Sequence, residues 1–394
     1  MNRKILYFLI ISFIGFFAIF SSTMSKSPIL PIFAESLMTS ESELQFIGYV
    51  IAASTIPGIL VSVIAGRLSD VYGRKKLILI SMIIFVSAPL FYLFAFNIWI
   101  LMVIRFYHGF STAIFVPVVT AAIAELHPEN KGKYISSFSS ITFVGRFLAP
   151  LTGGTILFIT NYYYYGVYLG CACSATIALI LTLFLYRTRH QYTEKLHGSD
   201  TSSITIKEFG KGIRKVLSHK VVLTTSVVQA SQYFAYGIIE AYVILYATSL
   251  HFNPLIIGLI PAILTLILVV FKPFMGTISD KVGRRLIINT GLLIGGIASL
   301  LISFATNFIW LILILCAFGV GMAMVISSTA AHVSDLSKVE DYGTSIGILS
   351  TIMDIGQTLG PIISGYILVA FSFVGVFWMV GFVLLISCIM FIFV

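Results

Sequence analysis

Five titratable side chains interrupt segments that are otherwise almost entirely apolar. The acids are Glu240 and Asp354, the bases are Arg105 and Arg146, and His108 lies beside Arg105. A charge inside a membrane costs roughly 3 kcal/mol on insertion scales, so such residues usually serve a function. A carboxylate shielded from water can take up and release a proton near neutral pH. We therefore expect Glu240 or Asp354 to carry a proton, with Arg105 and Arg146 tuning its pKa or binding an anionic group, and we expect His108 to titrate as well.

Each of these assignments has a structural alternative. Arg105 would alternatively form a fixed ion pair or extend its charge towards the outer membrane surface. His108 would alternatively be a hydrogen-bonded packing residue. Glu240 also ends a polar and aromatic stripe with helical spacing, formed by Gln229, Tyr233, Tyr236 and Glu240. Lys26 offers a cationic partner for Glu240, and a purely structural pair is the alternative to proton transport there.

Composition indicates the element that must position these residues, which is the membrane-spanning helix. Of the 394 residues, 58% are hydrophobic and 10% are charged, far from the averages of globular proteins. Apolar runs of about 20 residues, long enough to cross a bilayer, recur along the whole chain. The twelve runs lie near 5–34, 45–65, 77–96, 98–122, 134–159, 164–186, 221–249, 254–275, 286–305, 308–331, 343–370 and 373–394. The sequence predicts an all-α integral membrane protein with twelve transmembrane helices.

The basic residues predict the orientation of the chain. If the N-terminus is cytoplasmic, all but four of the 24 Lys and Arg residues fall in the N-terminus or the inner loops. The exceptions are Lys26, Arg105, Arg146 and Lys272. This bias predicts a multi-pass protein of the cell membrane with both termini cytoplasmic. The net charge of +9 then reflects topology and contact with anionic lipid, and nucleic-acid binding is not expected.

An internal repeat divides the chain in two. At an offset of about 210 residues, "GRLSDVYGRKKLI" (66–78) matches "GTISDKVGRRLII" (276–288), and "GRFLAPLTGG" (145–154) matches "GQTLGPIISG" (356–365). Such parallel repeats predict two pseudo-symmetric six-helix bundles with substrate between them, as in transporters. We expect an N-terminal bundle over 1–188, a cytoplasmic linker with a short amphipathic helix over 189–219, and a C-terminal bundle over 220–394.

The repeated loop carries a family resemblance over the whole chain. Gly66, Asp70, Gly73, Arg74 and Lys75 match the pattern G-x-L-x-D-x-x-G-R-[KR] of the major facilitator superfamily, and Gly276, Asp280, Gly283, Arg284 and Arg285 repeat it. The resemblance implies the major facilitator fold and a cytoplasmic gate. In this gate Asp70 would meet the N-terminus of the helix starting near Gly343, where the helix dipole is positive. Arg74 would pair with Glu125, and Arg284 with Asp335. The alternative is that these charges only set the topology.

Two further segments resemble motifs of proton-coupled members. "IRFYHGFSTA" (104–113) is similar to the fourth-helix motif, which includes Arg105 and His108. Gly145, Pro150, Gly153 and Gly154 resemble the fifth-helix motif of the antiporter branch, although Ala149 replaces one glycine; Gly356, Gly360 and Pro361 repeat it. Small residues allow close helix packing. Ordinary membrane packing is the alternative interpretation.

The resemblance also implies which residues face substrate, because the first, fourth, seventh and tenth helices line the cavity in this family. The expected substrate-binding residues are Ser25, Lys26, Gln229, Gln232, Tyr233, Tyr236 and Gln357. No nucleotide-binding loop or metalloprotease motif is present, so we expect neither an enzyme nor a nucleotide. We also expect no metal and no cofactor, with the proton gradient as the energy source.

The chain therefore resembles the twelve-helix drug–proton antiporters, which export small hydrophobic or amphiphilic compounds by alternating access. The expected partners are substrate, protons and lipid, and a monomer is sufficient. The alternatives are a proton symporter or uniporter, an exporter of a sugar, an anionic metabolite or a metal chelate, and, remotely, a membrane sensor that transports nothing.

Overall fold

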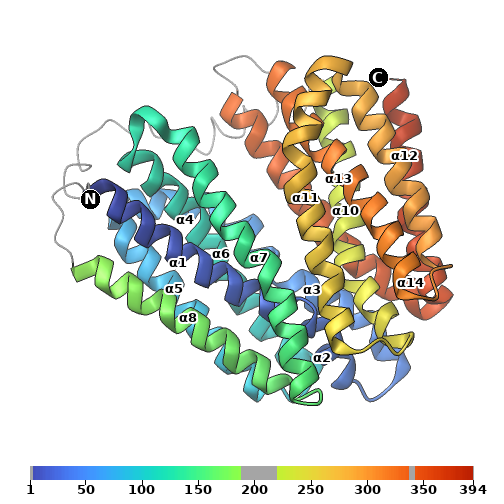
Figure 1. Cartoon of the computed structure of the whole chain (residues 1–394), viewed down its shortest axis with the longest axis horizontal. Coiled ribbons are helices and arrows are strands. Elements are labelled where there is room, and N and C mark those ends of the chain that lie inside the picture. The colour runs from blue at the N-terminus through green and yellow to red at the C-terminus, as the bar shows by residue number, and fades with distance from the viewer. Residues whose placement is uncertain (1–2, 188–219, 337–341, 394) are drawn as a thin grey trace. The chain divides into compact units, whose positions relative to one another are not determined.

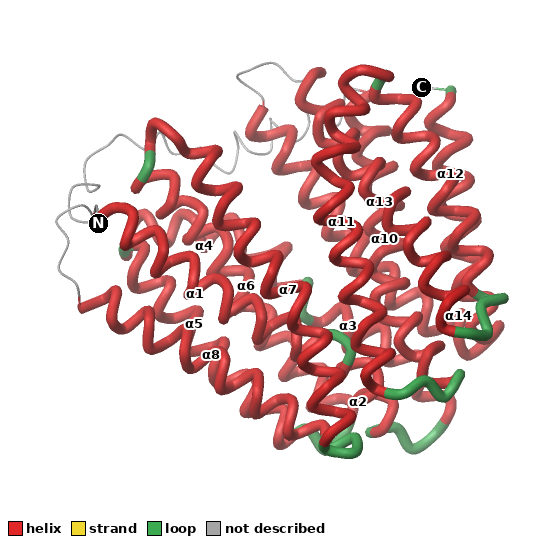
Figure 2. The backbone as a smooth tube through the Cα atoms, viewed as in Figure 1, coloured by secondary structure: helices red, strands yellow, loops and turns green. Residues whose placement is uncertain are grey.

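The structure is a computed structural model that describes residues 3–187, 220–336 and 342–393. The regular elements in these ranges are all helices (Figure 2). The predicted linker, 189–219, lies outside the described residues, and so does its amphipathic helix. Many large apolar side chains stay exposed on the helices, for example Val103 and Ile309 at 69% each. Such exposure is typical of a surface covered by lipid and not by water.

Figure 1 labels the α-helices of the first half, and the first half also contains three short 3₁₀ helices, η1 to η3. In chain order the helices are α1 (Arg3–Lys26), α2 (Ile29–Ser36), η1 (Glu41–Phe46), α3 (Ile47–Ala53), α4 (Ile56–Tyr72), α5 (Arg74–Phe91), η2 (Tyr92–Phe94), α6 (Ile98–Leu126), η3 (Pro128–Asn130), α7 (Lys131–Ile159) and α8 (Tyr164–Arg187). Two predicted runs are thus each divided into two helices. Pro28 precedes α2, and Pro57 lies in the first turn of α4. Because proline has no backbone N–H, it begins a helix more readily than it continues one.

The second half repeats this pattern with fewer interruptions. Its helices are α10 (Lys220–Ser249), α11 (Pro254–Val282), α12 (Arg284–Ile302), α13 (Phe308–Leu336) and α14 (Tyr342–Ile392). α14 covers two predicted runs and has non-helical backbone at Phe371 and Ser372, where the sequence predicts a boundary. Asn97 and Asn307, equivalent in the repeat, each cap a helix by accepting a backbone N–H bond, of 2.9 and 3.0 Å.

Ten stretches of the described residues are long and apolar enough to span a membrane. The predicted twelve differs from this number in two places. α10 is not among the ten, because its Gln, Ser, Thr and Glu side chains lower its mean hydropathy. The stretch from Thr351 to Ile392, 42 residues long, counts once although it contains the break at Phe371 and Ser372.

The chain forms two compact units. Unit 1 consists of 1–39, 49–200 and 253–262, and unit 2 consists of 40–48, 201–252 and 263–394. They differ from the predicted bundles because the segments 40–48 and 253–262 each belong to the unit formed mainly by the other half. These segments hold equivalent places in the repeat, at the starts of the second and eighth apolar runs.

The core of unit 1 lies between α1, α5, α6, α7 and α8. Its wholly buried side chains include Met82, Phe85, Phe115 and Val118, with the Phe85 and Phe115 rings edge to face at 5.8 Å. In unit 2, Leu292, Phe318, Phe377 and Leu384 are buried completely. These apolar cores fix the positions of the polar groups described next.

Candidate functional site

The first charged site lies at the turn between α4 and α5. Gly73 joins the two helices with φ of +93°, and Gly283 joins α11 and α12 with φ of +108°. A side chain is strained at such angles, so glycine suits both turns. Each turn places an arginine, Arg74 or Arg284, at the first position of the following helix. Both guanidinium groups can then reach back to the end of the preceding helix.

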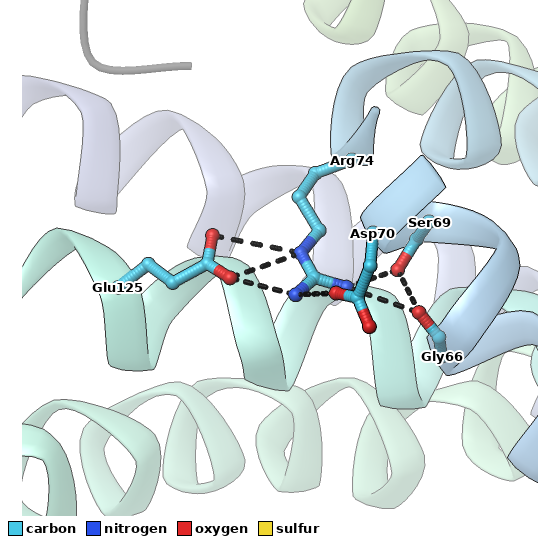
Figure 3. Close-up of polar contacts among 5 residues, drawn as sticks. All are labelled: Gly66, Ser69, Asp70, Arg74 and Glu125. Atoms are coloured by element: carbon cyan, nitrogen blue, oxygen red, sulfur yellow. Dashed lines mark hydrogen bonds and ion pairs between the residues drawn. The ribbon is translucent and has the colours of Figure 1, made fainter. Parts of the chain in front are cut away.

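Arg74 joins three helices (Figure 3). Its Nη2 lies 2.6 Å from Glu125 Oε1 on α6, and its Nε donates to the same oxygen at 3.2 Å. Its Nη1 donates to the Gly66 carbonyl at 3.2 Å and also to the Ser69 hydroxyl. The Asp70 carboxylate, at the end of α4, forms a second ion pair with Arg74. A single cation therefore fixes the ends of α4 and α6 against the start of α5.

The second half contains an equivalent site. Arg284 Nε donates to Asp335 Oδ2 at 3.1 Å, and its Nη1 donates to Ser279 Oγ at 2.8 Å. Asp280 forms the adjacent ion pair. Both predicted pairs, Arg74–Glu125 and Arg284–Asp335, are thus present in the structure.

The two sites differ in exposure. The Glu125 side chain is 30% exposed and that of Asp335 is 57% exposed. Exposed ion pairs contribute about 0.2–1 kcal/mol each. Such pairs hold a helix end while remaining weak enough to break during a conformational change. The expected contact of Asp70 with the helix start near Gly343 would join different units and stays a prediction, as does the role of both sites as a gate.

A second polar site is buried in unit 1 around Arg105 on α6, which is only 3% exposed. Arg105 Nη1 donates to Tyr92 Oη at 3.1 Å, and Nη2 donates to Ser54 Oγ at 2.7 Å. Tyr92 Oη also lies 3.2 Å from His108 Nδ1. Arg105 and His108 are therefore brought together with two hydroxyl groups, and the fixed ion pair considered as the alternative for Arg105 is absent from the described residues.

Arg146 on α7 has a different environment. It is exposed on unit 1, and its guanidinium lies over the Phe143 ring at 5.6 Å from the centroid. That distance is typical of a cation–π contact. The structure thus separates the two predicted arginines, because Arg105 is enclosed and Arg146 is accessible. In the repeat, Arg146 corresponds to Gln357, and Phe143 corresponds to Asp354.

The predicted acids and their neighbours are half-buried. Glu240 lies on α10 and Asp354 on α14, both in unit 2. The rings of Tyr233 and Tyr236, two turns and one turn before Glu240, meet edge to face at 6.4 Å between centroids. Lys26 belongs to unit 1, so its pairing with Glu240 stays a prediction.

The remaining predicted substrate ligands are largely enclosed. Gln229 is 5% exposed and its Oε1 accepts a 2.6 Å hydrogen bond from Thr329 on α13. Gln232 is fully buried, and neither polar atom of its side chain has a partner among the described residues. The buried Ser25 donates to Ser22 O at 2.8 Å. Gln357 is half-buried and packs beside Gly237.

The predicted packing glycines lie at close helix contacts. A Cβ on Gly145 would lie 3.0 Å from Phe16 O on α1, and one on Gly153 would lie 3.1 Å from Ile29 Cδ1 on α2. Gly356 lies against Ala230 O on α10, and a Cβ on Gly360 would lie 2.5 Å from Phe234 O. In each unit, therefore, the first glycine of the motif packs on the first helix of that half.

Gly154 makes a different contact, with the start of α11 inside unit 1. A Cβ on Gly154 would lie 2.6 Å from Pro254 O, and a Cβ on Gly258 would lie 2.5 Å from Pro150 O. In unit 2, Tyr242 Oη donates to Pro361 O at 2.8 Å, and Gly48 lies against the same carbonyl. Pro150 and Pro361 thus both offer backbone carbonyls at closely packed crossings.

Several residues at these sites are not among those predicted from sequence. They are Ser54, Ser69, Tyr92, Gly258 and Ser279. Ser69 and Ser279 hold the same place in the repeated loop, and that repetition is a signal that identifies them. Ser54 and Tyr92 carry no such signal, since their contacts with Arg105 depend on the packing of separate helices.

Comparisons with known proteins agree with the helices and motifs described above. The chain matches the Major Facilitator Superfamily over residues 11–268 and again over 225–394. It is 24% identical to multidrug resistance protein 2 of Bacillus subtilis, over 86% of this chain and 83% of that protein. It is 26% identical to the quinolone resistance protein NorA of Staphylococcus aureus, over 93% and 90% of the two chains.

A solved structure shows the same fold. The crystal structure of a D-xylose–proton symporter superposes with a TM-score of 0.79 at 16% identity, covering 98% of this chain and 97% of that one. The family match extends over more than half of the chain, and the described helices include ten membrane-spanning candidates. This chain therefore belongs to the Major Facilitator Superfamily, as a multi-pass membrane transporter and not an enzyme.

Proposed function

We propose that the protein is a proton-coupled antiporter that exports small hydrophobic or amphiphilic compounds by alternating access. The observation that carries this proposal is its similarity, over more than four-fifths of the chain, to relatives named for multidrug and quinolone resistance. The closely packed crossing at Gly154 and Gly258 supports it, because close packing between helices restricts leakage of ions.

In this mechanism the two arginine sites hold the helix ends together in one conformation and release them in the other. Each exposed ion pair contributes only about 0.2–1 kcal/mol. Proton or substrate binding can shift a conformational equilibrium by a comparable or larger amount. Arg74 and Arg284 would exchange partners as the transporter opens and closes, with no covalent chemistry.

The proposed proton carrier is Glu240 on α10 or Asp354 on α14, and both residues are half-buried. Protonation of an outward-facing carboxylate would displace substrate and permit return to the inward-facing state. Tyr233 and Tyr236 offer aromatic surface for an apolar substrate. The proton gradient supplies the energy. We further propose a monomer in the cell membrane with both termini cytoplasmic, from the distribution of Lys and Arg.

Proteoliposomes with an imposed pH gradient test the proposal against a panel of fluorescent lipophilic cations. Wild-type protein is expected to accumulate the dyes only with the gradient. Glu240→Gln or Asp354→Asn is expected to abolish this gradient-driven transport while binding remains detectable. Glu129→Gln serves as the control, since Glu129 is exposed in η3, at the first residues of the candidate span Pro128–Ile159. Full gradient-driven transport in both variants would rule the scheme out.

The exposure of Arg146 favours a second candidate, an exporter of anionic metabolites or metal chelates. Counterflow with anionic compounds separates the two, and Arg146→Glu is expected to change substrate selection only if the arginine binds substrate. Counterflow of a sugar, with dyes excluded, would favour the symporter or uniporter alternative.

A further inference from the structure

The network around Arg105 contains more hydrogen-bond donors than acceptors. Arginine can only donate, so Tyr92 Oη and Ser54 Oγ both act as acceptors toward Arg105. The Ser54 hydroxyl proton is directed at Ile51 O, at 3.5 Å. The Tyr92 hydroxyl proton is then available for His108 Nδ1, at 3.2 Å. In this arrangement Tyr92 Oη, Ser54 Oγ and His108 Nδ1 each already accept a hydrogen bond.

The tautomer of His108 follows from this arrangement. Because Nδ1 accepts from Tyr92, the ring proton of a neutral His108 resides on Nε2. His108 is 2% exposed, and Nε2 has no hydrogen-bond partner among the described residues. His108 therefore presents an unused buried donor next to the arginine.

Two further donors of the network are also unused. Arg105 Nε and Tyr168 Oη are buried without a partner in the described part of the chain. The Tyr168 ring stacks on the ring of Tyr92, with 4.3 Å between centroids, and Tyr92 is the residue whose hydroxyl accepts from Arg105. No described carboxylate forms an ion pair with Arg105. The site thus contains the uncompensated positive charge of Arg105. It also contains three buried polar atoms without a hydrogen-bond partner among the described residues, which are Arg105 Nε, His108 Nε2 and Tyr168 Oη.

The repeat shows that the fold does not require this polar network. At the offset of 210 residues, the equivalents of Ser54, Tyr92, Arg105 and His108 are Leu264, Ile302, Leu315 and Phe318. All four of these apolar residues are at most 4% exposed. An apolar cluster thus occupies the same place in the second half. Retaining a buried cation in the first half needs a reason other than packing.

We propose that Arg105 holds a small inorganic monovalent anion of the size of chloride, with His108 Nε2 and Tyr168 Oη as further donors. An anion supplies the hydrogen-bond acceptor and the negative charge that the Arg105 site lacks. A water molecule supplies an acceptor but leaves the charge uncompensated. The site lies seven residues, or about 10 Å, from the Ile98 end of α6. This proposal does not depend on the identity of the transported compound.

Thermal unfolding of the purified full-length protein tests the site. Chloride, bromide and nitrate are titrated against gluconate, which is too large for a buried site, at constant pH and ionic strength. A ligand of the folded state raises the Tm. The wild type is expected to show a saturable rise of a few degrees with the small anions, and Arg105→Gln is expected to lose it.

Two controls keep the test decisive. Lys133→Gln removes an exposed cation on α7 of the same unit and is expected to retain the full anion response. Arg105→Leu copies Leu315, which the second half carries at this place, and it serves as the second uncharged variant if Arg105→Gln does not fold. Equal Tm values in chloride and gluconate for the wild type would overturn the proposal, as would an unchanged chloride response in both Arg105 variants.

A crystal grown in bromide provides an independent measurement. An anomalous peak beside Arg105 Nε supports the site. Ordinary water density at that position, without an anomalous signal, contradicts it.

Discussion

The crossing of Gly154 and Gly258 allows a quantitative prediction for Gly154→Ala. An alanine Cβ at 154 would lie 2.6 Å from Pro254 O and 2.9 Å from Gly258 Cα, whereas ordinary contacts begin at 3.4 Å. The start of α11 must therefore move away from α7 by about 0.8 Å. Both contacts are with backbone atoms, so no flexible side chain can move aside.

Overpacking a well-packed interior lowers the free energy of unfolding by about 1–3 kcal/mol, and we expect this displacement to have the same cost. Alanine also favours the helix over glycine by about 1 kcal/mol. A control that shares this second effect is therefore needed. Gly58→Ala on α4 provides it, because a Cβ there meets nothing within 4 Å.

The measurement is the Tm of the two variants in the same detergent, together with dye transport in proteoliposomes. Gly154→Ala is expected to be about 1–3 kcal/mol less stable than Gly58→Ala, which corresponds to several degrees in Tm. Adding Gly258→Ala is expected to cost less than the sum of the single changes, since both side chains would enter the same contact. Equal Tm values for Gly154→Ala and Gly58→Ala would refute the reasoning.

The other predictions concern the helix ends. Arg74→Gln is expected to lower the Tm more than Arg284→Gln in parallel melts, because the acid paired with Arg74 on α6 is the less exposed one; the reverse order would contradict this ranking. Gly73→Ala is expected to destabilise the protein by about 1–2 kcal/mol, because its φ of +93° disfavours a side chain, whereas Gly66→Ala in the preceding helix α4 should not. Burial and a neighbouring lysine hold the pKa of His127 below its usual 6.5, so the unfolded chain binds the proton more readily as pH falls. Stability should therefore decrease below about pH 6.5, and His127→Gln, melted over the same pH range, should reduce that decrease; an identical pH profile in the variant would exclude His127 as its source.

The sequence predicts those parts of the structure that depend on local or repeated patterns. Arg74 and Glu125 are 51 residues apart, yet their pairing follows from a repeated motif at fixed positions on two helices. The break between Phe371 and Ser372 coincides with a boundary between apolar runs. Periodicity and repetition are sufficient in both cases.

Other contacts depend on three-dimensional packing and cannot be predicted in this way. Gly258 is important because its backbone touches Gly154, and no side-chain pattern encodes that contact. Tyr92 and Ser54 are ordinary hydroxyl residues until the helices bring them to Arg105. The burial of Gln232 likewise depends on which face of α10 packs inward, and the polar stripe alone does not determine that face.

The exchanged segments 40–48 and 253–262 bear on whether the chain can be divided into two polypeptides. A fragment ending near residue 188 lacks the 253–262 segment that completes unit 1, and a fragment starting near residue 220 lacks the 40–48 segment of unit 2. Neither fragment can therefore build a whole unit by itself. Separately produced fragments should be unstable, and co-expression should rescue them through mutual complementation.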